Sequence, residues 1–129
     1  MTQTIADIMT TDLVTFQPDQ NIHQAIHILL DKRISGAPVI DETGSLVGIL
    51  SRKDCLKIAF SASYHDSWAE KVRDYMVSEV KTMDAGVDIT SAAQMFLESS
   101  FRRYPVMRDG ALVGIVSRHD ILSALRKYM

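Results

Sequence analysis

The sequence predicts a mixed α/β (α+β) fold, in which two β-α-β-β-α repeats pack sheet to sheet with pseudo-twofold symmetry. Three observations predict this fold: an internal repeat that covers most of the chain, an alternation of short apolar runs with amphipathic stretches, and an ordinary globular composition. Of the 129 residues, 47% are hydrophobic and 23% are charged, so the chain can bury a core and does not resemble a disordered protein.

The internal repeat appears when the chain is aligned with itself. Residues 7–39 recur 67 positions later, and residues 44–56 recur 66 positions later because one residue is lost in a turn. The alignment divides the chain into repeat 1 at 1–60, a connector at 61–71 and repeat 2 at 72–129. One copy alone leaves a sheet face exposed, so we expect the two copies to form halves of one domain. The first-copy residues that are identical in the second copy are Asp7, Met9, Thr15, Ile22, Ala25, Leu30, Pro38, Val39, Gly44, Leu46, Val47, Gly48, Ile49, Ser51, Arg52, Asp54 and Leu56.

Each copy has the pattern strand, helix, strand, strand, helix. The first strand is expected at 14–16, and apolar residues at helical spacing predict an amphipathic helix from Ile22 to Leu30 and again from Ile89 to Leu97. A Gly-containing turn between the apolar runs 37–40 and 46–50 predicts a hairpin. The strand–helix–strand crossover should make the first two strands parallel. The second helix is expected to begin near Ser51, with inward residues at Cys55, Leu56 and Ala59 and, in repeat 2, at Ile121, Leu122 and Leu125.

Charge and cysteine content exclude several classes of protein. The net charge of −2 offers no global attraction for DNA or anionic lipid, so neither is an expected partner. The lone Cys55 excludes an internal disulfide and a zinc site built on several thiolates, and we expect it to be a small core residue. The absence of a signal peptide and of a bilayer-length apolar run predicts a cytoplasmic protein without membrane insertion.

One motif present in both copies is suited to binding. An apolar strand that contains glycine leads directly into a helix through Ser-x-x-Asp, at 51–54 and at 117–120. The simplest interpretation is a capping box, in which serine and aspartate close the first turn of the helix. The same helix end attracts phosphate, and a carboxylate can accept hydrogen bonds from a ribose diol. Gly48 and Gly114 are expected to leave the strand backbone open to a planar ring. The basic neighbours of the motif are Arg52, Lys53, Arg118 and His119.

With its Asp-x-Met openings, its Pro-Val before each hairpin and its two Ser-x-x-Asp motifs, the chain resembles a tandem pair of cystathionine-β-synthase (CBS) domains, a Bateman module. The resemblance covers everything except the connector. It implies clefts between the repeats that bind an adenosyl ligand, either AMP, ADP or ATP, with S-adenosylmethionine or NAD(H) as alternatives, and no required cofactor. It also implies energy sensing and a homodimer in which two modules form a disc of four repeats.

The resemblance further implies which residues contact the ligand. The Ser-x-x-Asp of one repeat would hold ribose and phosphate, and the first strand and pre-proline segment of the other repeat would flank adenine. One cleft would combine Ser117 and Asp120 with Met9, Val14, Ile34, Ser35 and Ala37. The other would combine Ser51 and Asp54 with Met76, Val80, Phe101 and Tyr104. Further implied contacts are Arg102, Arg103, Arg118 and His119 for phosphate and Ile115 for adenine.

The two implied clefts are unequal. Arg102 and Arg103 align with the uncharged Ser35 and Gly36 of repeat 1, so we expect the cleft that holds Asp120 to be the stronger binder.

The sequence offers little for catalysis or metal binding. His23 and His27 have a spacing that suits zinc, but no third ligand lies nearby and we expect both at the surface. Ser117, His119 and Asp120 fall within one helical turn and cannot form a catalytic relay, so neither a catalytic nor a metal site is expected.

Three hypotheses of function follow. The first is a regulatory module that binds an adenosyl nucleotide and signals to an unidentified protein target by a change of conformation. The second is a scaffold or dimerisation module whose Ser-x-x-Asp motifs only cap helices, and the third is a binder of other anions or metals. The aromatic residues Phe60, Tyr64 and Trp68, in the stretch 57–71 that has no counterpart, predict a partly packed loop, with a lid or a dimer contact as alternatives.

Overall fold

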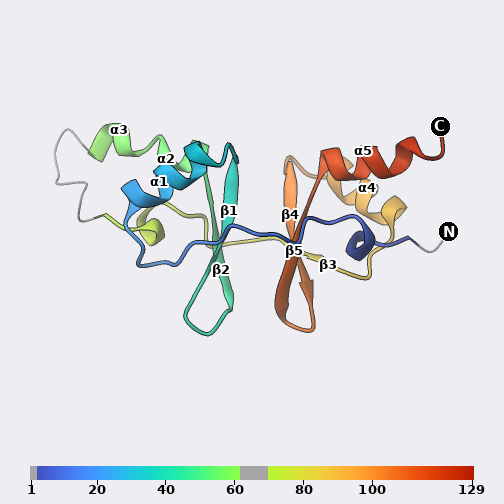
Figure 1. Ribbon diagram of the computed structural model, residues 1–129, viewed down its shortest axis with the longest axis horizontal. Coiled ribbons are helices and arrows are strands. Elements are labelled where there is room, and N and C mark those ends of the chain that lie inside the picture. Colours follow the sequence, from blue (N-terminus) through green and yellow to red (C-terminus); the bar gives the residue numbers. More distant parts are fainter. Residues whose placement is uncertain (1–2, 62–69) are drawn as a thin grey trace. The chain divides into compact units, whose positions relative to one another are not determined.

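The computed structural model describes residues 3–61 and 70–129 and divides the chain into two compact units (Figure 1). We call Val14–Val80 the central unit and Met1–Leu13 together with Lys81–Met129 the terminal unit. Each unit therefore contains the body of one repeat and the opening segment of the other. The predictions for Tyr64 and Trp68 concern positions outside the described residues.

The central unit is built on a two-stranded antiparallel sheet. Ala37 lies opposite Leu50, and the register shifts at a bulge between Val39 and Ile40. Phe16 forms a single parallel bridge to Val39, which adds one more backbone contact at the edge of the sheet. The elements are α1 (Ile22–Asp31), β1 (Gly36–Ile40), β2 (Leu46–Ser51), α2 (Arg52–Cys55), α3 (Ile58–Ser61) and the 3-10 turn η3 (Val72–Asp74).

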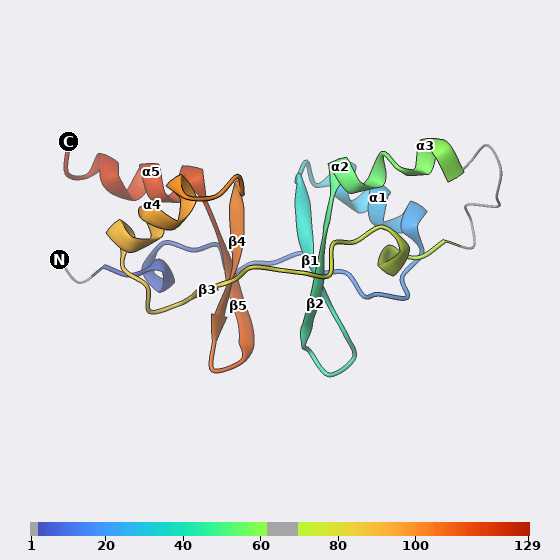
Figure 2. The same cartoon turned by 180° about the vertical axis from the view of Figure 1, so that it is seen from behind.

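The terminal unit repeats this plan with a three-stranded sheet in the order β3-β4-β5. The strand β3 runs parallel to β4, as the crossover rule predicts, and β4 is antiparallel to β5 with a bulge between Val106 and Met107. Figure 2 shows, from behind, that α4 and α5 lie next to one another at one end of β4 and β5. The elements are the 3-10 turn η1 (Ile5–Asp7), β3 (Met83–Asp84), α4 (Ile89–Leu97), β4 (Arg103–Arg108), β5 (Ala111–Ser117) and α5 (Arg118–Arg126).

Side-chain caps mark where the helices begin, and glycines in the left-handed backbone conformation mark where the hairpins turn. The Asn21 side chain accepts hydrogen bonds from two backbone N–H groups at the start of α1, and Asp88 accepts one from Ser91 at the start of α4. The hairpin turns contain Gly44 at φ 85° and Gly110 at φ 80°, a region that a side chain would strain. Local sequence therefore determines where the helices begin and where the hairpins reverse.

Each unit has its own hydrophobic core, and each core includes a fully buried residue from an opening segment. In the terminal unit this residue is Ile5, which packs in the cluster that contains Met83 and Ile89. In the central unit it is Val72, which packs in the cluster that contains Phe16 and Ile22. Burial of an aliphatic side chain is worth about 1.5–3 kcal/mol, so each opening segment stabilises the unit of the other repeat.

The predicted mixed fold and the order helix, hairpin, helix are confirmed. The expected strand at 14–16 is wrong, because only Phe16 pairs: its N–H donates to Pro38 O and its carbonyl accepts from Ile40 N. The second helix of repeat 1 is also interrupted between α2 and α3.

Several leucines predicted to face inward are exposed instead. Leu30, Leu97, Leu56 and Leu122 have exposed fractions of 57%, 81%, 70% and 62%, and Ala59 is also exposed. The preceding residue already occupies the inward face, and the next position in a helix is rotated by about 100°. The inward residues are Leu29, Phe96, Cys55 and Ile121, which confirms Cys55 as a core residue.

Candidate functional site

Both Ser-x-x-Asp motifs form the predicted capping box. In the terminal unit, Ser117 N donates to Asp120 Oδ2 at 2.8 Å and Asp120 N donates to Ser117 Oγ at 3.1 Å. In the central unit the same two bonds measure 3.0 Å and 3.2 Å between Ser51 and Asp54. The cap uses one carboxylate oxygen, and within the described residues the Oδ1 atom of Asp120 makes no hydrogen bond. This oxygen is therefore available as an acceptor at the start of a helix.

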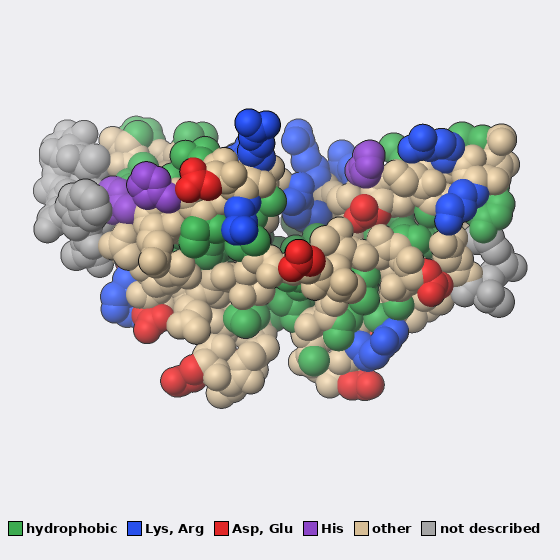
Figure 3. Space-filling model, viewed as in Figure 1, with side chains coloured by type: hydrophobic (Ala, Val, Ile, Leu, Met, Phe, Trp, Pro, Cys, Tyr) green, Lys and Arg blue, Asp and Glu red, His purple; other side chains and the backbone are tan. Residues whose placement is uncertain are grey.

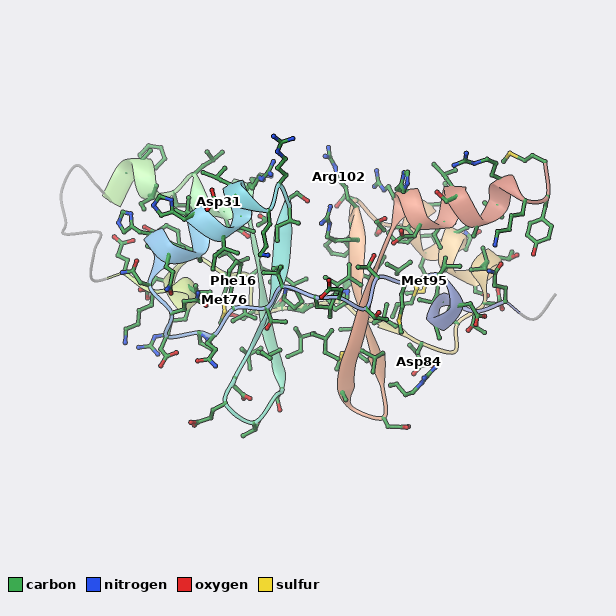
Figure 4. The ribbon with its side chains drawn as sticks, viewed as in Figure 1. Phe16, Asp31, Met76, Asp84, Met95 and Arg102 are labelled. Atoms are coloured by element: carbon green, nitrogen blue, oxygen red, sulfur yellow. The ribbon has the colours of Figure 1, made fainter. Side chains whose placement is uncertain are left out.

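The terminal unit places basic side chains beside this cap. Arg103 lies opposite Ser117 in the β4–β5 ladder, and Arg118 N donates to Arg102 O at 3.1 Å. The Arg118 side chain is anchored by a 3.0 Å hydrogen bond from Nε to Phe101 O. Figure 4 shows Arg102 at the beginning of β4, and in Figure 3 Lys, Arg and His side chains gather over the start of α5.

Burial and two neighbouring charges of opposite sign act on Arg103 at this helix start. Burial lowers the pKa of the half-buried Arg103, Asp120 raises it, and the charge of Arg102 lowers it further. No carboxylate within 3–61 and 70–129 forms an ion pair with these arginines or with Arg118. The site is thus a cationic surface next to one carboxylate, a combination that suits a ligand with both hydroxyl and anionic groups.

The central unit has the same backbone geometry without the added charge. Gly36 lies opposite Ser51, and Arg52 N donates to Ser35 O at 2.9 Å. Ser35 and Gly36 occupy the positions of Arg102 and Arg103. Arg52 is exposed, as is its counterpart Arg118, so the difference in charge between the two sites comes from the positions of Ser35 and Gly36.

The glycine before each motif contacts a methionine, which corrects the expectation of a face open to a planar ring. A Cβ atom on Gly114 would lie 2.5 Å from Met9 Sδ and 2.9 Å from Thr10 O. A Cβ atom on Gly48 would lie 2.7 Å from Met76 Sδ. The glycines therefore allow the opening segments to approach the strands.

A pocket lies next to the pre-proline segment of the terminal unit. It has a volume of about 410 Å³ and is lined in part by Tyr104, Lys81 and Glu98. The Tyr104 hydroxyl donates to Ser99 Oγ at 2.9 Å, and its ring packs edge-on against Phe96 at 5.0 Å. Tyr104 therefore lines the pocket with its hydroxyl bonded to Ser99 and its ring packed against Phe96.

The structure distributes the candidate residues between the two units. The adenine contacts predicted at Ala37 and Tyr104 are only 2% and 3% exposed. That each cleft combines residues from both repeats remains a prediction. In the terminal unit lie Met9, Arg102, Arg103, Tyr104, Ile115, Ser117, Arg118, His119 and Asp120, and in the central unit lie Val14, Ile34, Ser35, Ala37, Ser51, Asp54, Met76 and Val80.

Apart from Met9 and Ile115, the residues that attach the opening segments were not among the predicted site residues. Thr10 and Ile115 exchange backbone hydrogen bonds of 2.8 Å and 2.9 Å, and Val77 and Ile49 exchange two of 2.9 Å. Asp7 accepts a 2.8 Å bond from Thr4 N and thereby caps the turn that carries Met9. The sequence did contain a signal for this attachment, because both Asp-x-Met and the strand glycine recur in the two repeats. A strand position without a side chain allows the methionine to pack closely.

The parts of the chain that the structure describes contain no group of three or more His, Cys, Asp and Glu side chains placed to hold a metal ion. Among the same residues, none of the helices has the length and apolar character needed to cross a bilayer.

Comparisons with known proteins give one family. The family described as "CBS domain" matches residues 5–61 and 72–127. The crystal structure of CBSX2 of Arabidopsis thaliana in complex with AMP is 31% identical, with a TM-score of 0.84 over 97% of each chain. The CBS domain pair of protein MJ0100, in complex with 5-methylthioadenosine and S-adenosyl-L-methionine, is 26% identical, with a TM-score of 0.79 over 95% of this chain and 99% of that one.

Curated relatives include both short and long proteins. An uncharacterized 17.7 kDa protein of Acidianus ambivalens is 31% identical, and the match covers 97% of this chain and 74% of that protein. Other relatives are much longer than the match. The chain spans 42% of the uncharacterized protein MJ1225 and 23% of an inosine-5'-monophosphate dehydrogenase, both of Methanocaldococcus jannaschii.

Proposed function

The chain belongs to the CBS-domain family, and from this premise we propose that it is a regulatory module that binds an adenosyl nucleotide, with AMP, ADP or ATP as the preferred ligand. The observation that carries the proposal is the terminal Ser-x-x-Asp site. There Asp120 keeps one carboxylate oxygen unbonded within the described residues, beside three arginines that form no ion pair among those residues. The bound AMP of CBSX2 and the bound adenosyl compounds of MJ0100 support the ligand class.

Each group at the site has a defined role in this proposal. The capping box fixes the carboxylate of Asp120, so that its Oδ1 atom can accept hydrogen bonds from the ribose hydroxyls. The hydroxyl of Ser117 accepts from Asp120 N and keeps its own proton for a phosphate oxygen. The guanidinium groups of Arg103 and Arg118 supply charge-assisted hydrogen bonds to the phosphate. None of these roles requires a bond to be made or broken, so the module acts by binding and not by catalysis.

Regulation follows if the ligand binds one arrangement of the two repeats more tightly than another. Such a ligand shifts the population toward that arrangement. The free energy of the shift cannot exceed the difference between the ligand's binding free energies for the two arrangements. A partner protein that recognises one arrangement would then respond to the nucleotide. A reducing compartment such as the cytoplasm is consistent with a single buried thiol at Cys55.

We also propose that two copies of the chain associate through exposed helix faces. Leu30 and Leu97 occupy equivalent positions, as do Leu56 and Leu122, and all four are more than half exposed. An apolar groove of about 470 Å³ between α4 and α5 includes Leu97 and Leu122 in its lining. This groove would pack against the same surface of a second copy, which is the self-complementary contact of a closed twofold dimer.

Light scattering after size-exclusion chromatography tests the dimer. The double variant Leu97→Glu/Leu122→Glu should be a monomer at concentrations where the wild type is a dimer. Thr43→Glu, on the exposed hairpin of the central unit, is the control and should keep the wild-type mass. A wild-type monomer at high micromolar concentration would refute the dimer and leave the ligand proposal intact.

Binding measurements test the ligand proposal. Thermal-shift assays with AMP, ADP, ATP, S-adenosylmethionine and NADH should show stabilisation, because a ligand at 100 times its dissociation constant adds about 2.7 kcal/mol. Calorimetric titration of Asp120→Ala should show affinity reduced by roughly 10- to 150-fold, the loss of one charge-assisted bond.

The matched control is Asp88→Ala, which removes a helix cap from the same unit and should leave nucleotide affinity unchanged. If no adenosyl compound stabilises the protein, the proposed function is wrong.

A further inference from the structure

We propose that Met9 and Met76 are sites of reversible oxidation, at which a peroxide converts the thioether to a sulfoxide and loosens the attachment of an opening segment to its unit. The inference goes beyond nucleotide binding and does not rest on it. The observation that carries it is the position of the two sulfur atoms, each of which lies against a strand glycine and beside the backbone hydrogen bonds that hold the segment.

Each methionine sulfur fills the space that a side chain on the strand would need. A Cβ atom on Gly114 would lie 2.5 Å from Met9 Sδ and 2.8 Å from Met9 Cγ. On Gly48 it would lie 2.7 Å from Met76 Sδ and 3.1 Å from Met76 Cγ. The sulfur and the strand are thus in direct contact, and an oxygen atom added to the sulfur has no space on the side that faces the strand.

The polar atoms beside this contact also disfavour a sulfoxide. From the same Cβ positions, the carbonyl oxygen of Thr10 would lie at 2.9 Å in the terminal unit and that of Val77 at 3.0 Å in the central unit. Both carbonyls already accept a backbone hydrogen bond, from Ile115 N and from Ile49 N respectively. A sulfoxide oxygen is an acceptor, so on this side it would face a second acceptor instead of a donor.

Both methionines are partly exposed side chains at the edge of a core. Met9 packs against the terminal core, and Met76 packs against the central core that contains Phe16 (Figure 4). Met83, by contrast, is only 1% exposed. Peroxide is small and polar and reaches thioethers from water, so it can react with the two partly exposed methionines while Met83 is shielded.

The reaction is a two-electron oxidation that needs only hydrogen peroxide. A lone pair of the sulfur attacks one peroxide oxygen, so that an S–O bond forms and the O–O bond breaks. The second oxygen takes up the proton of the first and leaves as water, which makes the peroxide the species that is reduced. A methionine sulfoxide reductase reverses the change with two thiols, which form a disulfide while the oxygen leaves as water.

A displaced methionine should also disturb the core of its unit. Met9 N donates to Ile5 O at 2.9 Å, and Met76 N donates to Val72 O at 2.9 Å. Ile5 and Val72 are the fully buried residues of the two opening segments. Each methionine is therefore joined through a short turn to the residue that anchors its segment, and oxidation should raise the population in which the segment is detached.

Amide hydrogen exchange measured by NMR tests the inference on the full chain. After treatment of the wild type with hydrogen peroxide, the amides of Ile115 and Ile49 should exchange about 10-fold faster, because an overpacked contact favours local opening. Peptide mass spectrometry of the same sample should show one added oxygen atom at Met9 and at Met76. Methionine sulfoxide reductases for both sulfoxide epimers, supplied with a dithiol, should restore the original exchange rates.

Two leucine variants separate the units, because leucine is close to methionine in volume and has no sulfur to oxidise. In Met9→Leu, peroxide should leave the Ile115 amide protected and should still accelerate exchange at Ile49. In Met76→Leu the pattern should be reversed. Met129→Leu is the matched control, since it removes a methionine that is 91% exposed, and it should respond to peroxide as the wild type does.

Three results would overturn the inference. The first is oxidation of Met129 without oxidation of Met9 and Met76. The second is uptake of oxygen at both sites with unchanged exchange at Ile115 and Ile49. The third is loss of protection at Ile115 in peroxide-treated Met9→Leu to the same extent as in the wild type. All three leave nucleotide binding untouched, because the affinity for nucleotides is measured separately.

Discussion

The second helix begins in the same way in both units and then continues differently. In the central unit α2 ends after four residues at Cys55 and the chain resumes in α3, whereas α5 of the terminal unit continues for nine residues to Arg126. The caps differ as well. Ser51 Oγ donates to Asp54 Oδ2 at 2.8 Å, but Ser117 Oγ donates to no described residue. The same Ser-x-x-Asp motif therefore uses its hydroxyl proton within the cap in the central unit, whereas in the terminal unit that proton is not donated to any described residue.

The cores differ at the position that precedes the proline. Tyr104 packs edge-on against Phe96 at 5.0 Å and against Phe101 at 5.6 Å, while the corresponding residue of the central unit is Ala37. The terminal unit thus holds its pre-proline segment with aromatic contacts worth about 0.5–1.5 kcal/mol each beyond their burial. The segment with these aromatic contacts is also the one that carries Arg102 and Arg103.

The largest expected loss of stability comes from a substitution that tests which unit the first opening segment stabilises. Ile5→Ala should destabilise the protein by about 2–5 kcal/mol in urea unfolding, because the side chain is fully buried. In NMR spectra of the variant, shifts should be perturbed around Met83 and Ile89 of the terminal unit. Perturbation confined to residues 14–61 would show instead that repeat 1 folds on its own opening segment.

Substitution of the strand glycines should give the next largest loss of stability. Gly114→Ala should cost about 1–3 kcal/mol, and Gly48→Ala somewhat less, because the new Cβ meets Met9 Sδ at 2.5 Å but Met76 Sδ at 2.7 Å. Gly86→Ala is a control, since its Cβ would meet only the flexible Asp84 carboxylate at 3.1 Å. Equal stability of all three variants by thermal unfolding would contradict close packing of the opening segments.

Substitutions in the two caps should cause smaller losses of stability, and the two losses should differ. Ser117→Ala removes one cap bond and should cost about 1 kcal/mol. Ser51→Ala also removes the hydroxyl bond to Asp54 and should cost more. Urea unfolding of both variants measures the difference, and a larger loss for Ser117→Ala would mean that its hydroxyl is also committed inside the protein.

An effect that depends on pH concerns Cys55, whose counterpart in the terminal unit is Ile121. Burial, and then the charge of Asp54, raise the pKa of the Cys55 thiol from about 9 to about 11. The folded state therefore favours the neutral thiol, and the resulting stability is complete below about pH 9 and is lost as the pH rises toward 11. Thermal unfolding across this range should show a decline that is smaller in Cys55→Ala. Rapid alkylation of the native thiol by iodoacetamide at pH 8 would refute the raised pKa.

Local features of the fold were predictable from the sequence because they depend on local chemistry. The spacing of Ile22, Ala25 and Leu29 determines the buried face of α1, and the Ser-x-x-Asp spacing determines the caps. The exchange of opening segments was not predictable in this way, because Ile5 and Val72 are buried by residues far away in the sequence. The exposure of Leu97 and Leu122 was missed for a related reason: a helical stripe does not say which of two adjacent apolar residues faces the core.

A crystal structure of the protein grown in saturating AMP tests the central claim most directly. The account predicts a ribose hydroxyl within hydrogen-bond distance of Asp120 Oδ1, a phosphate facing Arg103, and an intact bond from Ser117 N to Asp120 Oδ2. A structure in which AMP lies elsewhere, or in which Asp120 contacts only its own cap and solvent, would contradict it.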